Sequence, residues 1–260
     1  MSIEGLAARA AFAGELARAA GALGLRYFTG ELEFTAEAKG EAQDWVSVAD
    51  HAVEQLIRDA LARRFPGDAM LGEEAGGTIA DRLWVVDPID GTLNFVHGMR
   101  YWCVSIAYIE NGVRRAAAIY DPSLDELFTA AAGAGARCNG VPIRVSACGS
   151  LDRALISQGY VHRHDLDTHL RLRRALLSAG AAVKDPGAGA LMLAHVAAGR
   201  FDAFYEPHMH PWDALAGLLL IEEAGGRVGA YPGPSGLVAG GAVVGAAPGI
   251  YDPLVALVQG

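Results

Sequence analysis

The sequence has few cysteines and few lysines. Its three cysteines, Cys103, Cys138 and Cys148, include no CxxC pair, so the pattern predicts neither a disulfide framework nor a thiolate zinc site. Free cysteines fit a reducing compartment, and we expect a cytoplasmic protein. The two lysines are Lys39 and Lys184, which are too few to supply the positive charge for a group of buried carboxylates.

The sequence also lacks a targeting segment and a long apolar run. Residues 1–21 carry acidic and basic side chains at helical spacing, which predicts an amphipathic surface helix and no signal peptide. The apolar stretch at 236–251 is interrupted by glycines and a proline, and it lacks the ~20 unbroken apolar residues of a membrane-spanning helix. A formal net charge of −9 disfavours nucleic acid and anionic membranes as partners.

Length and composition are those of an ordinary globular protein. The 260 residues are 52% hydrophobic and 20% charged, which excludes a disordered chain. The sequence contains no repeat of about 20 to 50 residues and no long Pro/Gly/Ser linker. We therefore predict one catalytic unit over residues 1–260, with an α+β half and antiparallel sheet at 1–148 and an α/β half at 149–260.

Hydrophobic periodicity predicts the main elements. Apolar residues that recur at i, i+3 and i+4 predict helices, and alternating or continuous apolar runs predict strands. Two Asn-Gly pairs, at 111–112 and 139–140, predict tight turns between antiparallel strands. The predicted helices cover 50–65, 166–177, 191–198 and 212–224. The predicted strands cover 83–86, 104–109, 113–120 and 201–205.

The segment 83–98 is the most informative part of the sequence. An apolar run is predicted to end as a strand at Asp87, to turn through Pro88-Ile89, and to present Asp90 and Thr92 ahead of a helix. Taken alone, this segment is also typical of an ordinary Asp-Gly turn followed by a threonine N-cap. Three more acidic residues stand at the ends of predicted elements. They are Glu73, Asp50 just before its helix, and Asp213.

Carboxylates that gather at element ends repel one another, and burying them without a counter-charge is costly. We therefore expect cations to bind there. Oxygen ligands without paired histidine or cysteine favour Mg²⁺ or Mn²⁺ over zinc. Two such ions ~4 Å apart support in-line attack of water on a phosphoryl group. The N–H groups of Gly91 and Thr92 are predicted to bind phosphate oxygens at the start of the helix.

Four motifs occur in order along nearly the whole chain. They are Gly-Glu-Glu at 72–74, Asp-Pro-Ile-Asp-Gly-Thr at 87–92 with Asn94-Phe95, Trp-Asp at 212–213 with Ala216-Gly217, and Glu-Ala-Gly-Gly at 223–226. Together they resemble the inositol monophosphatase family, and the aspartate-rich turn is the most specific of them. The resemblance implies an α/β fold, arranged as a layered αβαβα sandwich, and a lithium-sensitive, Mg²⁺-dependent phosphatase that forms a homodimer.

The resemblance also implies roles for the acidic residues. Two or three Mg²⁺ ions, with Mn²⁺ as a substitute, would be bound near a nucleophilic water. Thr92, hydrogen-bonded to Asp50, would take the proton from that water, because a hydroxyl gains basicity only when a carboxylate accepts its own proton. The implied metal ligands are Glu73, Asp87, the Ile89 carbonyl, Asp90 and Asp213. The implied catalytic residues are Glu73, Thr92 and Asp50.

The substrate pocket is implied in the same way. Glu206, seven residues before Asp213, stands where inositol-cleaving members use a glutamate to bind a substrate hydroxyl; an exposed carboxylate at a strand end is the alternative interpretation. Ala188 lacks the hydroxyl that the family usually carries there, and Asp185 is an added charge, so the alcohol part of the substrate stays open. The residues implied to bind substrate are Gly91, Thr92, Gly187, Ala188, Gly189, Glu206 and Asp213.

Several functions remain in competition. The favoured activity is that of a phosphoric monoester hydrolase acting on inositol 1-phosphate or a similar polyol phosphate. Histidinol phosphate is the first alternative substrate, followed by adenosine 3′,5′-bisphosphate and fructose 1,6-bisphosphate. The alternative outside enzymology is a binding module in transcription or ribosome assembly, since some family members act in that way. Lys39 matches the family's loop lysine, which indicates a further metal-binding region unless it is simply exposed.

Three further groups carry weaker signals. His208 and His210 form an HxH pair, for which a place at the substrate mouth or in solvent is favoured over zinc binding. The run 162–169 contains three histidines and two aspartates, and its polar alternation predicts a solvated loop that enters a helix. Cys103 is predicted to be a buried hydrophobic residue rather than a nucleophile.

Overall fold

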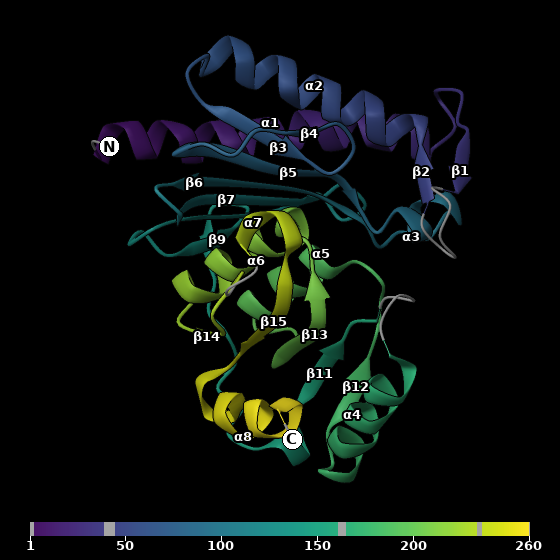
Figure 1. Cartoon of the computed structure of the whole chain (residues 1–260), viewed down its shortest axis with the longest axis vertical. Helices are drawn as coiled ribbons and strands as arrows, with labels where there is room; N and C mark the ends of the chain where they lie inside the picture. The colour runs from purple at the N-terminus through teal and green to yellow at the C-terminus, as the bar shows by residue number, and fades with distance from the viewer. Residues whose placement is uncertain (1–2, 39–44, 161–164, 233–235, 260) are drawn as a thin grey trace.

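The Asn-Gly turn at 111–112 joins the two central strands of the larger sheet. Asn111 and Gly112 both have positive φ, 51° and 74°, which is the backbone of a type I′ hairpin turn. The turn connects β6 (Cys103–Glu110) to the antiparallel β7 (Val113–Asp121), as the sequence predicts. The computed structural model shown in Figure 1 describes residues 3–38, 45–160, 165–232 and 236–259.

The larger sheet has eight strands in the order β10-β9-β8-β7-β6-β5-β3-β4. Its neighbours are antiparallel except β3 and β5, which are parallel. The second Asn-Gly turn joins β9 to β10, as predicted. The other strands are β3 (Ala69–Gly72), β4 (Gly76–Gly77), β5 (Arg82–Asp90), β8 (Glu126–Ala131), β9 (Ala136–Cys138) and β10 (Val141–Pro142).

The smaller sheet has five strands in the order β12-β11-β13-β15-β14. Strand β11 is parallel to its neighbours β12 and β13. Strand β15 is antiparallel to its neighbours β13 and β14. These strands are β11 (Leu155–Gln158), β12 (Ala182–Lys184), β13 (Ala203–Met209), β14 (Arg227–Val228) and β15 (Gly241–Ala246). A separate pair, β1 (Ala36–Ala38) and β2 (Trp45–Ser47), lies beside the start of α2.

Five layers alternate in Figure 1 as helices, sheet, helices, sheet, helices. The outer helices α1 and α2 pack on the larger sheet, α5 and α6 fill the space between the sheets, and α4 and α8 cover the smaller sheet. This is the layered α/β sandwich that the family resemblance implies. The helices are α1 (Ile3–Phe28), α2 (Val48–Arg64), α3 (Thr92–Val96), α4 (Leu166–Ser178), α5 (Gly189–Ala197), α6 (Pro211–Glu223), α7 (Gly236–Ala239), α8 (Pro248–Gln259) and the 3₁₀ turn Leu151–Arg153.

The middle layer follows from composition. Helix α5 carries apolar side chains on almost every face, and all eight of its residues after Gly189 are buried. A helix that is apolar all round has to be covered on both sides, so α5 and α6 lie between the two sheets. All strands of the larger sheet precede residue 143 and all strands of the smaller one follow residue 154. The boundary at 148–149 and the single catalytic unit remain predictions.

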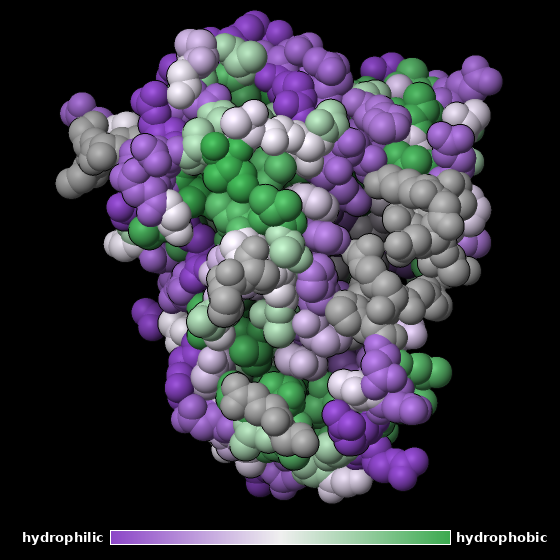
Figure 2. Space-filling model, in the orientation of Figure 1, coloured by the Kyte–Doolittle hydropathy of each residue, from purple (hydrophilic) through white to green (hydrophobic). Residues whose placement is uncertain are grey.

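Two predicted boundaries near the site are wrong. Strand β5 continues to Asp90 and does not end at Asp87, because β6 pairs with it past an irregularity between the two aspartates. Helix α2 begins at Val48, so Asp50 lies in its first turn and not before it. The described residues contain no helix long and apolar enough to cross a membrane. In Figure 2, a green apolar area lies around α7, and the rest of the visible face is mixed.

Candidate metal centre and phosphate site

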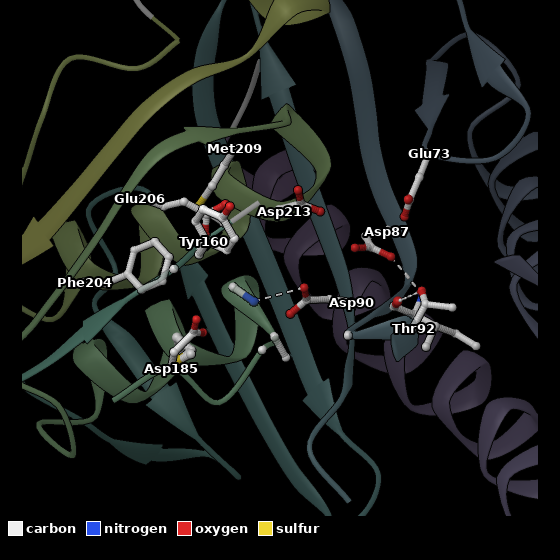
Figure 3. Close-up of a pocket in the computed structure, with 17 residues that line it drawn as sticks. Glu73, Asp87, Asp90, Thr92, Tyr160, Asp185, Phe204, Glu206, Met209 and Asp213 are labelled. Carbon is white, nitrogen blue, oxygen red and sulfur yellow. Dashed lines mark hydrogen bonds between the residues drawn. The ribbon is translucent and has the colours of Figure 1, made fainter. Parts of the chain in front are cut away.

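Three carboxylates meet at one point between the two halves of the chain. Asp87 and Asp90 stand at the end of β5, and Asp213 stands in the first turn of α6. One oxygen of each lies within 4.8 Å of the others. Asp87 is 2% exposed and Asp90 is 7% exposed. Figure 3 shows Glu73 pointing toward Asp87 from the turn after β3.

The end of β5 places the first two of these carboxylates. Pro88 has no N–H to donate, and the pairing between β5 and β6 shifts between Asp87 and Asp90. Within this irregular segment the Ile89 N–H donates to Asp87 Oδ1 at 2.9 Å. Gly91 then has a φ of +91°, which favours glycine, and a Cβ there would lie 3.0 Å from that of Ala188.

Burial and neighbouring like charges raise the pKa of two of these carboxyls. Burial raises the pKa of Asp87 well above its usual value, and the nearby charges of Glu73, Asp213 and Asp90 raise it further. Burial and the charge of Asp213 also raise the pKa of Asp90 to about 7, although hydrogen bonds from α5 partly oppose this. Among the described residues that line the pocket, none is basic. Like charges buried together in this way require a cation or a proton.

These observations fit a site for a hard divalent cation. The available donors are carboxylate oxygens, together with the Ile89 carbonyl, which also lines the pocket. Such ligands favour Mg²⁺ or Mn²⁺. Asp87, Asp90 and Asp213 could hold the ion directly, with Glu73 beside them.

The carboxylate of Asp90 also caps helix α5. Its Oδ1 accepts the Gly189 N–H at 3.1 Å, and its Oδ2 accepts those of Ala190 at 2.9 Å and Leu191 at 3.2 Å. The N-cap residue of this helix, Ala188, makes no side-chain hydrogen bond. Asp90 therefore satisfies N–H groups that a serine or threonine cap would otherwise serve. A candidate metal ligand and the pocket wall at 187–189 are thus fixed to one another.

Two residues that hold the surroundings of the site, Cys103 and Asn94, were missed as site residues by sequence reasoning. Cys103 is fully buried, as predicted, and its Sγ lies 3.5 Å from Asp90 Oδ2. Asn94 donates through Nδ2 to Tyr101 O and Pro186 O, both at 2.8 Å. Asn94 therefore connects the turn after β5 to the loop that precedes α5. The motif contained Asn94, but nothing local indicated which distant carbonyls it would bind.

Thr92 and Asp50 come together as predicted from the resemblance. The Thr92 hydroxyl lies 3.3 Å from Asp50 Oδ1 and 3.0 Å from the Ile89 carbonyl oxygen. Asp50 is fully buried. Its Oδ2 accepts the Ser47 N–H at 2.8 Å and the Ser47 hydroxyl at 2.5 Å, which forms a capping box at the start of α2. Asp50 is thereby held with its other oxygen toward Thr92.

The carboxylates open onto a pocket of about 200 Å³. Asp50 is not among the described residues that line it, but it is hydrogen-bonded to Thr92, which does line it. Across the pocket from the carboxylates stand Glu206, Tyr160, Phe204, Met209 and Asp185, as Figure 3 shows. The other predicted site residues all line the pocket: Glu73, Asp87, Ile89, Asp90, Gly91, Thr92, Gly187, Ala188, Gly189, Glu206 and Asp213.

Glu206 is placed by a glycine on the neighbouring strand segment. A Cβ on Gly159 would lie 2.0 Å from Glu206 Oε2, so only glycine leaves room for this carboxylate. Glu206 is 8% exposed, which rules out the alternative of an exposed strand-end residue. Glu206 therefore lies in the wall of the pocket, where the resemblance places it.

Comparison with known proteins agrees with this geometry. The model of the inositol monophosphatase family matches residues 6–259. The chain belongs to the inositol monophosphatase family. It is 40% identical over 252 residues to the Nus factor SuhB of Pseudomonas aeruginosa, covering 94% of this chain and 93% of that protein. It is 42% identical over 193 residues to the inositol-1-monophosphatase of Rhizobium meliloti, covering 72% of each.

A solved structure of the family has the same fold. The extragenic suppressor protein suhB of Bartonella henselae superposes with a TM-score of 0.88 at 35% identity, covering 94% of this chain and 96% of that one. The two proteins therefore share the layered fold along nearly the full length of both chains.

The other weaker signals of the sequence, apart from Cys103, include residues outside the described ranges and two histidines away from the pocket lining. Lys39, His162 and His164 are outside the described residues. His208 Nε2 lies 2.6 Å from the Ala239 carbonyl oxygen, and the ring of His210 stacks on Trp212 at 4.6 Å. Neither histidine is among the described pocket-lining residues, and the acidic metal group does not include them.

Proposed function

We propose that this family member is a Mg²⁺-dependent phosphatase that hydrolyses a small phosphate monoester, with inositol 1-phosphate or a similar polyol phosphate as the favoured substrate. The observation that carries the proposal is the convergence of Asp87, Asp90 and Asp213 within 4.8 Å beside an open pocket. The lining residues that the structure describes include no lysine, arginine or histidine, and phosphate hydrolysis is chemistry that needs concentrated positive charge.

The residues that would hold two or three Mg²⁺ ions, or Mn²⁺ in their place, are Glu73, Asp87, the Ile89 carbonyl, Asp90 and Asp213. Bound Mg²⁺ would polarise the phosphate and lower the pKa of water. Lithium sensitivity, a homodimer and a cytoplasmic location belong to the same proposal, and the family resemblance supports the first two.

The chain itself supplies a path for the proton. The Thr92 hydroxyl takes the proton of the attacking water and gives its own proton to Asp50 Oδ1, which lies 3.3 Å away. The two hydrogen bonds from Ser47 go to the other oxygen, Oδ2. The N–H groups of Gly91 and Thr92 in the turn after β5 bind the phosphate oxygens.

The alcohol part of the substrate lies toward Glu206. A buried carboxylate accepts hydrogen bonds from hydroxyl groups, and a polyol presents several of them. The wall at 187–189 lines the same pocket, and Ala188 offers no hydroxyl there. Histidinol phosphate and then adenosine 3′,5′-bisphosphate are the next candidates.

A second candidate function is a binding role in transcription. The relative with 40% identity over 94% of this chain is named a Nus factor, and this likeness favours the candidate. The net charge of −9 points to protein rather than nucleic acid as the direct partner.

The deciding experiment is phosphate release from inositol 1-phosphate, histidinol phosphate and adenosine 3′,5′-bisphosphate, with and without Mg²⁺. We expect turnover only with Mg²⁺ and the highest kcat/KM for inositol 1-phosphate. A folded protein that releases phosphate from none of them, and that retains RNA polymerase components in a pull-down, would favour the binding role. Phosphate release that is unaffected by EDTA would contradict the metal-dependent mechanism.

A further inference from the structure

A second buried carboxylate stands behind the candidate metal centre. Glu54 lies on α2 and is 2% exposed. It is not among the described residues that line the pocket. Its side chain lies under the hairpin that joins β3 to β4, and that hairpin carries Glu73 at its turn.

The carboxylate of Glu54 binds the backbone of this turn directly. Its Oε2 accepts the Glu74 N–H at 2.8 Å, and its Oε1 accepts the Ala75 N–H at 3.1 Å. Arg58, one helical turn later, donates to Glu54 Oε1 at 2.7 Å and to the Gly76 carbonyl at 3.1 Å. The two residues of α2 therefore bind one backbone group on each of the three residues that follow Glu73.

Gly72 shows how closely the hairpin fits over this carboxylate. A Cβ at Gly72 would lie 2.5 Å from Glu54 Cδ, a distance that forces a shift of one or both groups. The glycine is therefore required by the buried carboxylate beneath it, and the Gly-Glu-Glu motif depends on a residue some 20 positions earlier in the chain.

These contacts fix Glu73 from both sides. The Glu73 N–H donates to the Val86 carbonyl at 3.2 Å, which attaches it to β5 immediately before Asp87. The next N–H, that of Glu74, is held by Glu54. The backbone of Glu73 thus has little freedom, and its side chain faces Asp87, as Figure 3 shows.

We propose that Glu54 is a positioning residue for the metal centre, which sets the place of the Glu73 carboxylate by binding the two N–H groups that follow it. The inference rests on the proposed function, because it takes Glu73 as a metal ligand. Glu54 touches neither substrate nor metal. Groups that orient a ligand are known to alter metal affinity by about 10- to 100-fold when they are replaced.

A glutamine at position 54 tests this directly. A carboxylate accepts at both oxygens, whereas a carboxamide accepts at one and donates at the other. In Glu54→Gln one of the two backbone N–H groups would face an NH₂ group, and the turn has to move. Arg58→Met is the control on the same helix. It removes the ion pair and the hydrogen bond to the Gly76 carbonyl, but it keeps both N–H bonds to Glu54.

The readout is calorimetric titration of the metal-free proteins with MgCl₂ and MnCl₂, beside urea unfolding in EDTA. We expect Glu54→Gln to weaken Mg²⁺ binding about tenfold, and Arg58→Met to lower stability while changing the affinity less than about threefold. Gly72→Ala, which pushes on the same carboxylate, should weaken Mg²⁺ binding as Glu54→Gln does. If Glu54→Gln does not fold, the Mg²⁺ affinity of Gly72→Ala tests the role of Glu54 in its place.

The possible failures are distinguishable. Wild-type affinity in folded Glu54→Gln, or in Gly72→Ala, would overturn the role of Glu54. Equal losses of affinity in Glu54→Gln and Arg58→Met would also overturn it, because a general loosening of α2 would then be sufficient. Absence of Mg²⁺ binding in the wild type, or wild-type affinity in Glu73→Gln, would instead contradict the proposed metal centre.

Discussion

The carboxylate of Asp90 accepts the N–H of Ala190 at 2.9 Å, although the two residues are 100 positions apart. One side chain thus serves as a candidate metal ligand at the end of β5 and as the cap of α5. Asp90 links the metal centre to the wall of the substrate pocket. A change at this residue should consequently alter metal binding and the start of α5 together.

Asp90→Asn should abolish turnover and leave the fold intact. Replacing a group that only orients a metal ligand lowers activity by about 10- to 100-fold. This variant loses a charged candidate ligand itself, so kcat should fall by more than about 100-fold. Loss of part of the cap costs about 1 kcal/mol, but removal of a buried charge near Asp213 opposes that loss. Phosphate release and circular dichroism check this prediction. Retained turnover would contradict the metal centre proposed here.

The metal-free protein should lose stability as the pH rises from about 4 to about 7. An unfolded aspartate titrates near about 3.9, whereas the pKa of Asp90 in the folded protein is raised to about 7. In this range the folded state keeps a proton that the unfolded state has released, so the free energy of unfolding falls with pH. The raised pKa of Asp87 acts in the same direction.

Mg²⁺ should reverse this loss, because it supplies the charge that the proton supplied at lower pH. The rise in Tm on replacing EDTA with MgCl₂ should therefore be small near pH 5 and large at pH 7 to 8. Asp90→Asn should weaken the pH dependence in EDTA. A Mg²⁺-induced rise in Tm that is the same at every pH would show that these carboxyls do not titrate in this range.

The fold was predictable where local pattern and burial agree. Helix α5 is apolar on almost every face, and its prediction at 191–198 differs from the observed Gly189–Ala197 by two residues at most. The end of β5 was not predictable, because its extension to Asp90 depends on pairing with β6 past an irregularity. The start of α2 at Val48 depends on the capping box between Ser47 and Asp50, and apolar periodicity alone carries no signal for Ser47.

The site divides in a similar way. Residues whose proposed role follows from their own side-chain chemistry, such as the carboxylates of Asp87 and Asp213, could be named from motifs. Those that act through long-range contacts could not, because a single sequence does not show which backbone groups a side chain will meet. Glu54 binds a peptide group 20 positions away. Asn94 binds one that is 92 positions away. Their roles became visible only in the folded chain.

Thr92→Ala should lower kcat without changing Mg²⁺ affinity. The hydroxyl is the group that passes a proton toward Asp50, and general acid–base steps contribute about 10²- to 10⁴-fold. Thr92→Ser keeps the hydroxyl and should retain most of the activity. Ser47→Ala is a control for stability, since it removes part of the α2 cap at a cost of about 1 kcal/mol. Single-turnover rates beside calorimetric Mg²⁺ titration separate these effects, and equal rates for Thr92→Ala and wild type would contradict the proton path.

Glu206→Gln should raise KM for inositol 1-phosphate and leave KM for p-nitrophenyl phosphate unchanged. A hydrogen bond to a charged group contributes about 1.5–3 kcal/mol, which corresponds to about 10- to 100-fold in KM. Gly159→Ala should act in the same direction while keeping the carboxylate, because its Cβ would lie 2.0 Å from Glu206 Oε2. Gly149→Ala is the matched control, since no atom lies within 4 Å of a Cβ there. If Glu206→Gln slows both substrates equally, Glu206 supports the site as a whole and does not select a polyol.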